Sequence, residues 1–254
     1  MQLKNRNIIV TGGCSGIGKA LVTAYLAEGA KVVAFDVNDQ AGQELAHEHD
    51  SDALRYIHCD IASDKSVSAA VISAVAFLGN LDVLVNCAGI APGAPAELID
   101  TAEWEQVFAV NALGTFLINR EVFPHLKERG GRVINFASGA GVRGYPGKAH
   151  YAASKGAVLG WTRSIATEWA PYGITVNAVA PAISTPMYEK TRASMSAEQL
   201  ALHDEDMARR IPIGGRLGDA ESDLAPVLVF LAGEGSRFVT GQTLAVDGGL
   251  MMVS

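Results

Sequence analysis

The sequence predicts a single α/β domain of the doubly wound type, in which helices cover both faces of one parallel β-sheet. Two observations predict this fold class. Short apolar runs alternate with amphipathic stretches along the chain, and a glycine-rich loop joins the first apolar run to the first amphipathic stretch. Such alternation is typical of βαβ units, in which each helix returns the chain to start the next parallel strand. The 254 residues are enough for one such domain with a sizeable core.

Seven short runs rich in apolar residues are the expected strands. They span residues 7–12, 31–36, 54–60, 81–89, 131–138, 174–181 and 242–249. Amphipathic stretches at 18–29, 66–79 and 101–123 are the clearest helices between them. The first helix should end at Gly29, since glycine suits the left-handed position after a helix, and the third should begin with Thr101 as its N-cap.

Residues 182–218 break this alternation, because they are rich in charge and methionine and contain no strand. A long excursion inside a compact domain is usually functional or disordered. We therefore expect a helical lid over a substrate site, across approximately residues 184–215.

Composition and charge exclude several classes of protein. A net charge of −7, with no large cluster of Lys and Arg, argues against nucleic-acid binding. The sequence has no apolar run of membrane-spanning length and no signal-peptide pattern, so we expect a cytoplasmic protein without membrane contact. Cys14, Cys59 and Cys87 form no CxxC pair, which favours buried thiols over a disulfide or a metal site.

The glycine-rich loop "TGGCSGIG" runs from Thr11 to Gly18, between the first strand and the first helix. Its glycines, Gly12, Gly16 and Gly18, do not fit the usual G-x-G-x-x-G spacing of dinucleotide-binding loops. Glycines still let the backbone turn tightly and approach a pyrophosphate, which the N–H groups of a helix N-terminus can bind. The loop therefore predicts a Rossmann-type nucleotide site.

The second strand ends at Asp36, where a carboxylate can accept hydrogen bonds from an adenosine ribose. Val37 is uncharged, and no Arg or Lys lies between Asp36 and Gly42 to bind a 2′-phosphate. These residues favour NAD over NADP. Asp60, at the end of the third strand, either reaches the adenine or caps the next helix.

The loop is the first of several motifs that occur in order. The others are Asn86, Ala88 and Gly89 after the fourth strand, Asn111 in the long helix, Ser138 after the fifth strand, Tyr151 with Lys155, and the segment from Pro181 to Thr185. Together they resemble the short-chain dehydrogenase/reductase family over essentially the whole chain. Two positions depart from the family pattern: Cys87 stands where a second Asn is more usual, and Ala182 where glycine is common.

Tyr151 and Lys155 are four positions apart, which puts both side chains on one face of a helix. The resemblance implies that Tyr151 is the general acid/base, exchanging a proton with an alcohol while hydride passes to the nicotinamide. A free phenol titrates near pH 10, and a cation about 4 Å away contributes roughly 4 kcal/mol at an effective dielectric near 20. We therefore expect Lys155 to lower the pKa of Tyr151 by up to about three units.

The resemblance implies roles for further residues. Ser138 should hydrogen-bond the substrate oxygen, and Asn111 should anchor a water that links Lys155 to solvent. Lys155 should also hold the nicotinamide ribose, and Thr185 should contact the cofactor amide. The other expected cofactor contacts are Gly12, Ser15, Gly16, Ile17, Gly18, Asp36, Asp60, Ile61, Asn86, Ala88, Gly89, Tyr151, Pro181 and Ile183.

The predicted activity is NAD-dependent hydride transfer between a small secondary alcohol, or its ketone, and the cofactor. A 3-oxoacyl-(acyl-carrier-protein) reductase using NADPH shares nearly all these motifs and is the alternative, followed by a non-catalytic dinucleotide sensor. Arg143 either meets an anionic group of the substrate or is an ordinary surface arginine. The other candidate substrate-lining residues, mostly apolar, are Ile90, Pro92, Ala140, Val142, Tyr145, Met187, Tyr188 and Met195.

The resemblance also implies a homotetramer. Trp161 and Trp169 lie on the helix of Tyr151, and the sequence ends in the apolar segment "GGLMMVS". We expect these residues to form exposed apolar patches, which usually mark an interface between copies.

Overall fold

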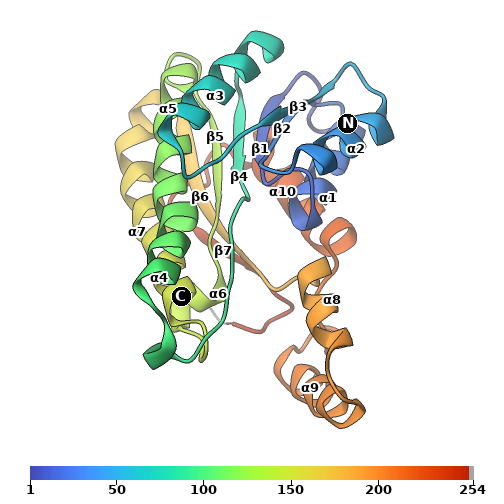
Figure 1. The fold of residues 1–254 in the computed structure, drawn as a ribbon. Helices are drawn as coiled ribbons and strands as arrows, with labels where there is room; N and C mark the ends of the chain where they lie inside the picture. Colours follow the sequence, from blue (N-terminus) through green and yellow to red (C-terminus); the bar gives the residue numbers. More distant parts are fainter. Residues whose placement is uncertain (252–254) are drawn as a thin grey trace.

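The computed structural model describes residues 1–251 and confirms the predicted fold class (Figure 1). Seven strands form one sheet in the order β3-β2-β1-β4-β5-β6-β7, and every neighbouring pair is parallel. The strands are β1 (Asn7–Thr11), β2 (Lys31–Asp36), β3 (Leu54–His58), β4 (Val83–Asn86), β5 (Gly131–Phe136), β6 (Ile174–Pro181) and β7 (Thr243–Val246). The order reverses beside β1, which is where open α/β sheets bind ligands, at the carboxyl ends of their strands.

Ten α-helices lie in the described part of the chain. They are α1 (Gly16–Ala27), α2 (Asp39–His49), α3 (Asp64–Leu78), α4 (Thr101–Phe108), α5 (Gly114–Leu126), α6 (Gly139–Arg143), α7 (Ala149–Trp169), α8 (Pro186–Ala193), α9 (Ala197–Arg210) and α10 (Ala225–Ala232). Short 3₁₀ turns span Ala96–Leu98, Ala170–Tyr172 and Glu234–Ser236, and π-helical turns span Ala109–Leu113 and Ala220–Leu224.

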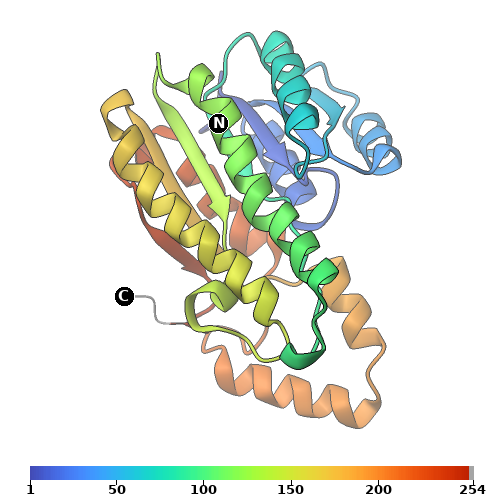
Figure 2. The ribbon, with the colours of Figure 1, turned by 60° about the vertical axis from the view of Figure 1, so that its left-hand side comes forward.

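The helices cover both faces of the sheet because successive strand residues point to opposite sides. Ile8 and Val10 of β1 join the core beneath α1 and α10, whereas Ile9 joins the core beneath α3, α5 and α7. Figure 1 shows these two helical layers on either side of the strands, and Figure 2 shows α5 and α7 running side by side across one face. Strands buried on both faces explain the continuous apolar runs of the sequence.

The long helix predicted over residues 101–123 differs from the expectation in two ways. Its N-cap is Asp100 rather than Thr101, because the Asp100 carboxylate accepts a hydrogen bond from the Glu103 N–H at 2.7 Å. The helix is also divided into α4 and α5 by the π-helical turn Ala109–Leu113, which contains Asn111. The predicted end of α1 is confirmed, since Gly29 has φ +85°.

The predicted exposure of the tryptophans on α7 is wrong for Trp169, and Trp161 is half-buried. Trp169 is 8% exposed and packs against Phe123, with ring centroids 4.8 Å apart. Trp161 packs edge-on against Phe116, and its indole N–H donates to the Asn119 amide oxygen at 3.1 Å. Both rings therefore belong to the core between α7 and α5. Residues 252–254 of the apolar end lie outside the described residues.

The segment at 182–218 is helical, as expected, and consists mainly of α8 and α9, which project beyond the carboxyl ends of the strands (Figures 1 and 2). The Tyr188 hydroxyl and His203 Nε2 join the two helices at 2.6 Å, and Arg192 forms an ion pair with Asp204. A cavity of about 330 Å³ lies between them. No helix of residues 1–251 is long and apolar enough to cross a membrane.

Candidate active site

The glycine loop after β1 forms a turn that only glycine can make. Gly12 has φ +63°, and a Cβ placed on Gly18 would lie 2.0 Å from the Gly12 carbonyl oxygen. Ser15 is the N-cap of α1, yet its side chain is exposed and caps no N–H group. The first N–H groups of α1 therefore have no side-chain cap and point toward the loop, which suits the pyrophosphate of a dinucleotide. Ile17, half-buried, packs on the core beneath them.

Asp36 ends β2 beside this loop. One carboxylate oxygen accepts from the Cys14 N–H at 3.2 Å and the other from the Asn38 N–H at 3.1 Å. Both contacts fix the carboxylate at the loop while leaving lone pairs for ribose hydroxyls. Within residues 1–251, no Lys, Arg or His forms an ion pair with Asp36, and Val37 is 57% exposed.

Asp60 and Ile61 follow β3. Asp60 is exposed, and its carboxylate accepts from the Ala62 N–H at 3.0 Å, so it stabilises the turn before α3, whose N-cap is Ser63. The second carboxylate oxygen remains open. Ile61 is 6% exposed and packs against Gly114, so only its backbone can meet a ligand.

Asn86 holds the strand ends together from within the core. Its amide oxygen accepts from the Thr11 hydroxyl at 2.9 Å, and its amide N–H donates to the Thr115 hydroxyl at 2.8 Å. The Thr11 hydroxyl also accepts from the Ala88 N–H at 3.1 Å. This buried network fixes the loop that carries Gly89 next to the glycine loop, since a Cβ on Gly12 would lie 2.9 Å from Ala88.

Asn111 is fully buried in the π-helical turn. Its amide group exchanges two hydrogen bonds with the peptide of Ile90, both at 2.9 Å, and also donates to the Ser154 hydroxyl at 3.0 Å. A Cβ on Gly89 would lie 3.1 Å from the Asn111 oxygen and 3.3 Å from Lys155 Nζ. Asn111 and Lys155 therefore flank Gly89, which is where a linking water was expected.

Lys155 does not act on Tyr151 as the sequence predicts. Its ammonium donates to the Phe136 carbonyl at 2.6 Å and lies 6.0 Å from the centroid of the Tyr151 ring. Burial lowers the pKa of Lys155 to about 8. Burial also raises the pKa of Tyr151 above its ordinary value, although a hydrogen bond from Ser138 opposes the rise. Burial therefore outweighs the attraction by Lys155 that we expected to lower the pKa of Tyr151.

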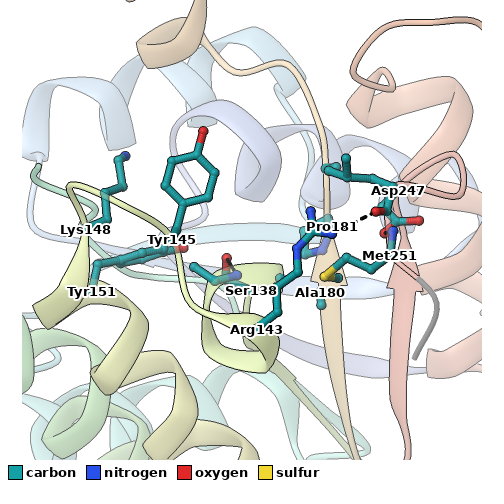
Figure 3. A pocket seen from close by; sticks show the side chains of 13 residues that line it. Ser138, Arg143, Tyr145, Lys148, Tyr151, Ala180, Pro181, Asp247 and Met251 are labelled. Atoms are coloured by element: carbon teal, nitrogen blue, oxygen red, sulfur yellow. Dashed lines mark hydrogen bonds between the residues drawn. The ribbon is translucent and has the colours of Figure 1, made fainter. Parts of the chain in front are cut away.

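Ser138 and Tyr151 line one cavity of about 220 Å³ at the carboxyl edge of the sheet (Figure 3). Ser138 is the N-cap of α6, and its hydroxyl accepts from the Ala140 N–H at 3.1 Å. The other lining residues are Gly139, Ala140, Arg143, Tyr145, Lys148, Ala180, Pro181, Ala182, Asp247, Leu250 and Met251. The cavity suits a compact molecule that presents an oxygen to the serine and tyrosine.

Pro181, Ile183 and Thr185 were expected at the nicotinamide end of the cofactor. Pro181, the last residue of β6, and Ala182 line this cavity, whereas Ile183 is 7% exposed and packs in the core. Thr185 is half-buried and is the N-cap of α8, where its hydroxyl accepts from the Tyr188 N–H at 3.2 Å. Of the predicted lining residues, Ala140 and Tyr145 border the cavity, whereas Tyr188 lines the separate cavity between α8 and α9.

The sequence reasoning missed two charged residues of the cavity, Lys148 and Asp247. Lys148 immediately precedes α7, so its place three residues before Tyr151 was a usable signal. Asp247 comes just after β7, and its carboxylate accepts from the Gly249 and Met251 N–H groups. Arg143, which was weighed as an anion ligand, donates to the Leu250 carbonyl at 3.0 Å.

The arrangement fits a dinucleotide laid along the carboxyl edge. Its pyrophosphate would meet the N-terminus of α1, its adenosine ribose would meet Asp36, and its nicotinamide would lie near Lys155 and Pro181. The Tyr151 hydroxyl then stands where it can exchange a proton with a substrate oxygen. Residues 1–251 contain no group of three or more His, Cys, Asp or Glu side chains placed to hold a metal ion.

Comparison with known proteins gives concordant matches. The model of the family described as enoyl-(acyl carrier protein) reductase matches residues 12–251. The chain is 37% identical to the 3-oxoacyl-(acyl-carrier-protein) reductase of Thermotoga maritima, over 99% of this chain and 100% of that protein. It is 39% identical to the 2-(R)-hydroxypropyl-CoM dehydrogenase of Xanthobacter autotrophicus, over 96% and 98% of the two chains.

Among solved structures, the 3-ketoacyl-(acyl-carrier-protein) reductase of Brucella melitensis, complexed with NADH, superimposes with a TM-score of 0.88. The two chains are 32% identical, and the match covers 98% of this chain and 100% of the other. The likeness therefore extends over the whole domain, including the carboxyl edge.

Proposed function

The chain belongs to the short-chain dehydrogenase/reductase family, and on that premise we propose that it interconverts a secondary alcohol and its ketone with NAD as cofactor. At the level of class, it is an oxidoreductase of CH–OH or ketone groups. The observation that carries the proposal is the meeting of Ser138 and Tyr151 in one compact cavity, with Lys155 buried behind the tyrosine.

In this proposal, the residues of the chain handle the proton and the oxygen. When bound, the cofactor would supply the hydride acceptor in oxidation, as NAD, and the hydride donor in reduction, as NADH. Tyr151 takes the hydroxyl proton in oxidation and donates it in reduction. Ser138 donates a hydrogen bond to the substrate oxygen, where negative charge develops. Asn111 holds the Ile90 peptide and Ser154 in place around Lys155.

Lys155 has a binding role in the proposal. Its pKa of about 8 leaves most of the ammonium charged at neutral pH, and its bond to the Phe136 carbonyl fixes it 6.0 Å from the centroid of the Tyr151 ring. It can also donate to the ribose hydroxyls next to the nicotinamide. An oxidised nicotinamide would bring a positive charge beside the phenol, which favours the phenolate and opposes the rise that burial causes in the pKa of Tyr151.

The preference for NAD rests on Asp36. Its carboxylate is held by the Cys14 and Asn38 N–H groups, and Val37 provides no cation beside it. A 2′-phosphate would meet this negative charge without a counter-ion. Hydroxyl groups, in contrast, would donate hydrogen bonds to it.

A 3-oxoacyl-(acyl-carrier-protein) reductase remains the second candidate, since two of the matched proteins carry that name. The small cavity and the net charge of −7 favour a compact substrate over an acidic carrier protein.

The test is NADH fluorescence during incubation of the protein with NAD or NADP and a panel of secondary alcohols. We expect NAD-dependent turnover of at least one alcohol. Tyr151→Phe should lower turnover by at least about a thousandfold, since it removes the proton-transfer group, while NAD affinity stays within about threefold. Turnover by Tyr151→Phe within tenfold of the unmodified enzyme would contradict the assignment. NAD binding without turnover of any substrate would favour the sensor.

A further inference from the structure

Lys148 is a cation held at the mouth of the substrate cavity. Its backbone pairs with Ala94 of the loop after β4, and the Ala94 N–H donates to the Gly147 carbonyl at 2.9 Å. Its ammonium donates to the Ala91 carbonyl at 3.1 Å and lies 5.8 Å from the centroid of the Tyr151 ring. Figure 3 shows Lys148 and Tyr145 projecting on the same side of the Tyr151 ring. The ammonium is therefore fixed beside the Tyr151 ring.

The ammonium of Lys148 forms no ion pair with the described carboxylates. Among residues 1–251, no carboxylate oxygen lies within 4.0 Å of its ammonium. One of its three N–H bonds is used by the Ala91 carbonyl, which leaves two donors for a ligand.

The other two charged residues that line the cavity, Arg143 and Asp247, carry opposite charges and lie at its far side. Arg143 donates to the Leu250 carbonyl, and Asp247 accepts from the Gly249 and Met251 N–H groups, so both are bound to the same turn. Figure 3 shows these two residues across Ser138 from Lys148. The half of the cavity nearest Tyr151 is thus left with one unpaired positive charge.

We propose that Lys148 binds an anionic group of the substrate, and that the substrate is a short hydroxy acid whose product is the matching oxo acid. This proposal rests on the function proposed above. A carboxylate is the smallest organic anion that fits beside the reacting carbon in a cavity of about 220 Å³. In the reducing direction, hydride from NADH and a proton from Tyr151 convert the ketone to the alcohol, and the carboxylate is unchanged.

The kinetic test uses pairs of substrates that differ only in charge, 3-oxobutanoate with 3-oxobutanamide and 4-oxopentanoate with 4-oxopentanamide. With NADH, the unmodified enzyme should prefer at least one acid over its amide by about 10- to 100-fold in kcat/KM, mainly through KM, as expected for a charge-assisted hydrogen bond. Lys148→Met should abolish this preference, by raising the KM of the acid toward that of its amide. Lys148→Arg should restore part of it.

The matched control is Lys65→Met, which removes the same charge from an exposed position on α3 and should keep the preference. Equal rates for acid and amide in the unmodified enzyme, or a preference that survives in Lys148→Met, would overturn the assignment of Lys148.

A binding measurement separates this proposal from the proposed activity. Ligand-observed NMR with the cofactor-free protein should detect 3-oxobutanoate or 4-oxopentanoate but not its amide, and Lys148→Met should lose the signal. If no substrate turns over but this binding is found, the activity is wrong and the anion site stands. If the binding is independent of Lys148, the anion site is wrong whatever the activity.

Discussion

At the scale of single residues, Lys155 is a buried charge that lowers the stability of the folded protein. It is 4% exposed, and the Phe136 carbonyl is its one hydrogen-bond acceptor among the described residues. Burial favours its neutral form, so its pKa is about 8 instead of 10.5. That difference corresponds to roughly 3 kcal/mol, because one pKa unit is about 1.4 kcal/mol. The cofactor-free protein is destabilised by this charge at neutral pH.

The first prediction concerns this destabilisation. The cost is complete below pH 8, where folded and unfolded chains are both protonated, and it falls as the pH rises toward 10.5, because the folded chain loses its proton first. Lys155→Met should therefore unfold with a free energy about 1–3 kcal/mol higher near pH 7, and this gain should shrink near pH 9.5. Urea unfolding of both proteins without cofactor, at each pH, measures this difference in the free energy of unfolding. A gain that grows with pH would contradict the argument, and turnover should be lost at every pH.

The second prediction concerns Asp36. A single charge pair about 4 Å apart, at an effective dielectric near 20, contributes roughly 4 kcal/mol of repulsion toward a 2′-phosphate, and partial exposure reduces it. We expect at least about a fiftyfold preference for NAD in kcat/KM. Asp36→Ala with Val37→Arg should reverse it, because the change removes the repulsion and adds a guanidinium for the phosphate. Steady-state rates with both cofactors measure the preference. Equal rates with NADP and NAD in the unmodified enzyme would show that Asp36 does not discriminate.

At the scale of elements, the sequence predicted the parts that follow from local patterns. All seven strands were predicted within a few residues, since each is a continuous apolar run between turn residues. The π-helical turn around Asn111 was not predictable, because its hydrogen bonds to Ile90 and Ser154 come from distant parts of the chain. The surroundings of Trp161 and Trp169 were not predictable for a similar reason. An apolar ring on a helix lies in the core or at an interface, depending on which residues pack against it.

The candidate site was also predictable from the sequence only in part. The motifs identified Ser138 and Tyr151, and both line the cavity. The pKa direction of Tyr151 was not predictable, because it depends on burial and on Lys155 turning to the Phe136 carbonyl. Lys148 was missed although it lies three residues before Tyr151, because spacing alone does not reveal that its charge has no carboxylate partner.

The third prediction concerns the helical segment α8–α9. No described side chain of α9 is buried, so the Tyr188–His203 hydrogen bond and the Arg192–Asp204 ion pair hold it to α8. Limited trypsin digestion should cut first near Lys190 or Arg209, and NAD with substrate should slow the cut if the segment closes over them. Tyr188→Phe should be cut several-fold faster without ligands. Equal digestion with and without ligands would rule out the lid.

At the scale of the whole molecule, exposed aromatic rings and an edge strand lie in the last part of the chain. Phe238, between α10 and β7, is 100% exposed, and Phe230 on α10 is 43% exposed. β7 is an edge strand, paired only with β6 in the described chain, and all four of its residues are half-buried. Unpaired edges and exposed aromatic rings are usually covered by another chain.

The fourth prediction is that the protein is a homotetramer, in which this edge is covered by a second copy. Light scattering at micromolar concentration should give about four times the chain mass of 26.6 kDa. Phe238→Asp should shift the population toward dimers or monomers, whereas Tyr172→Asp, a change at another exposed aromatic ring, should shift it less. A monomer at that concentration in the unmodified protein would refute the assembly.

The strand order also determines when the sheet can be completed during synthesis. β1 pairs with β2 on one side and with β4 on the other. Ile8 of β1 pairs with Val83 of β4, which lies far along the chain. As the chain leaves the ribosome, β1, β2 and β3 can assemble while the other edge of β1 stays open until residues 83–86 emerge. An open apolar edge of a nascent sheet is a site for association with other chains. The molecule should therefore be most prone to aggregate before β4 has docked, and slower translation before residue 83 should lower its soluble yield.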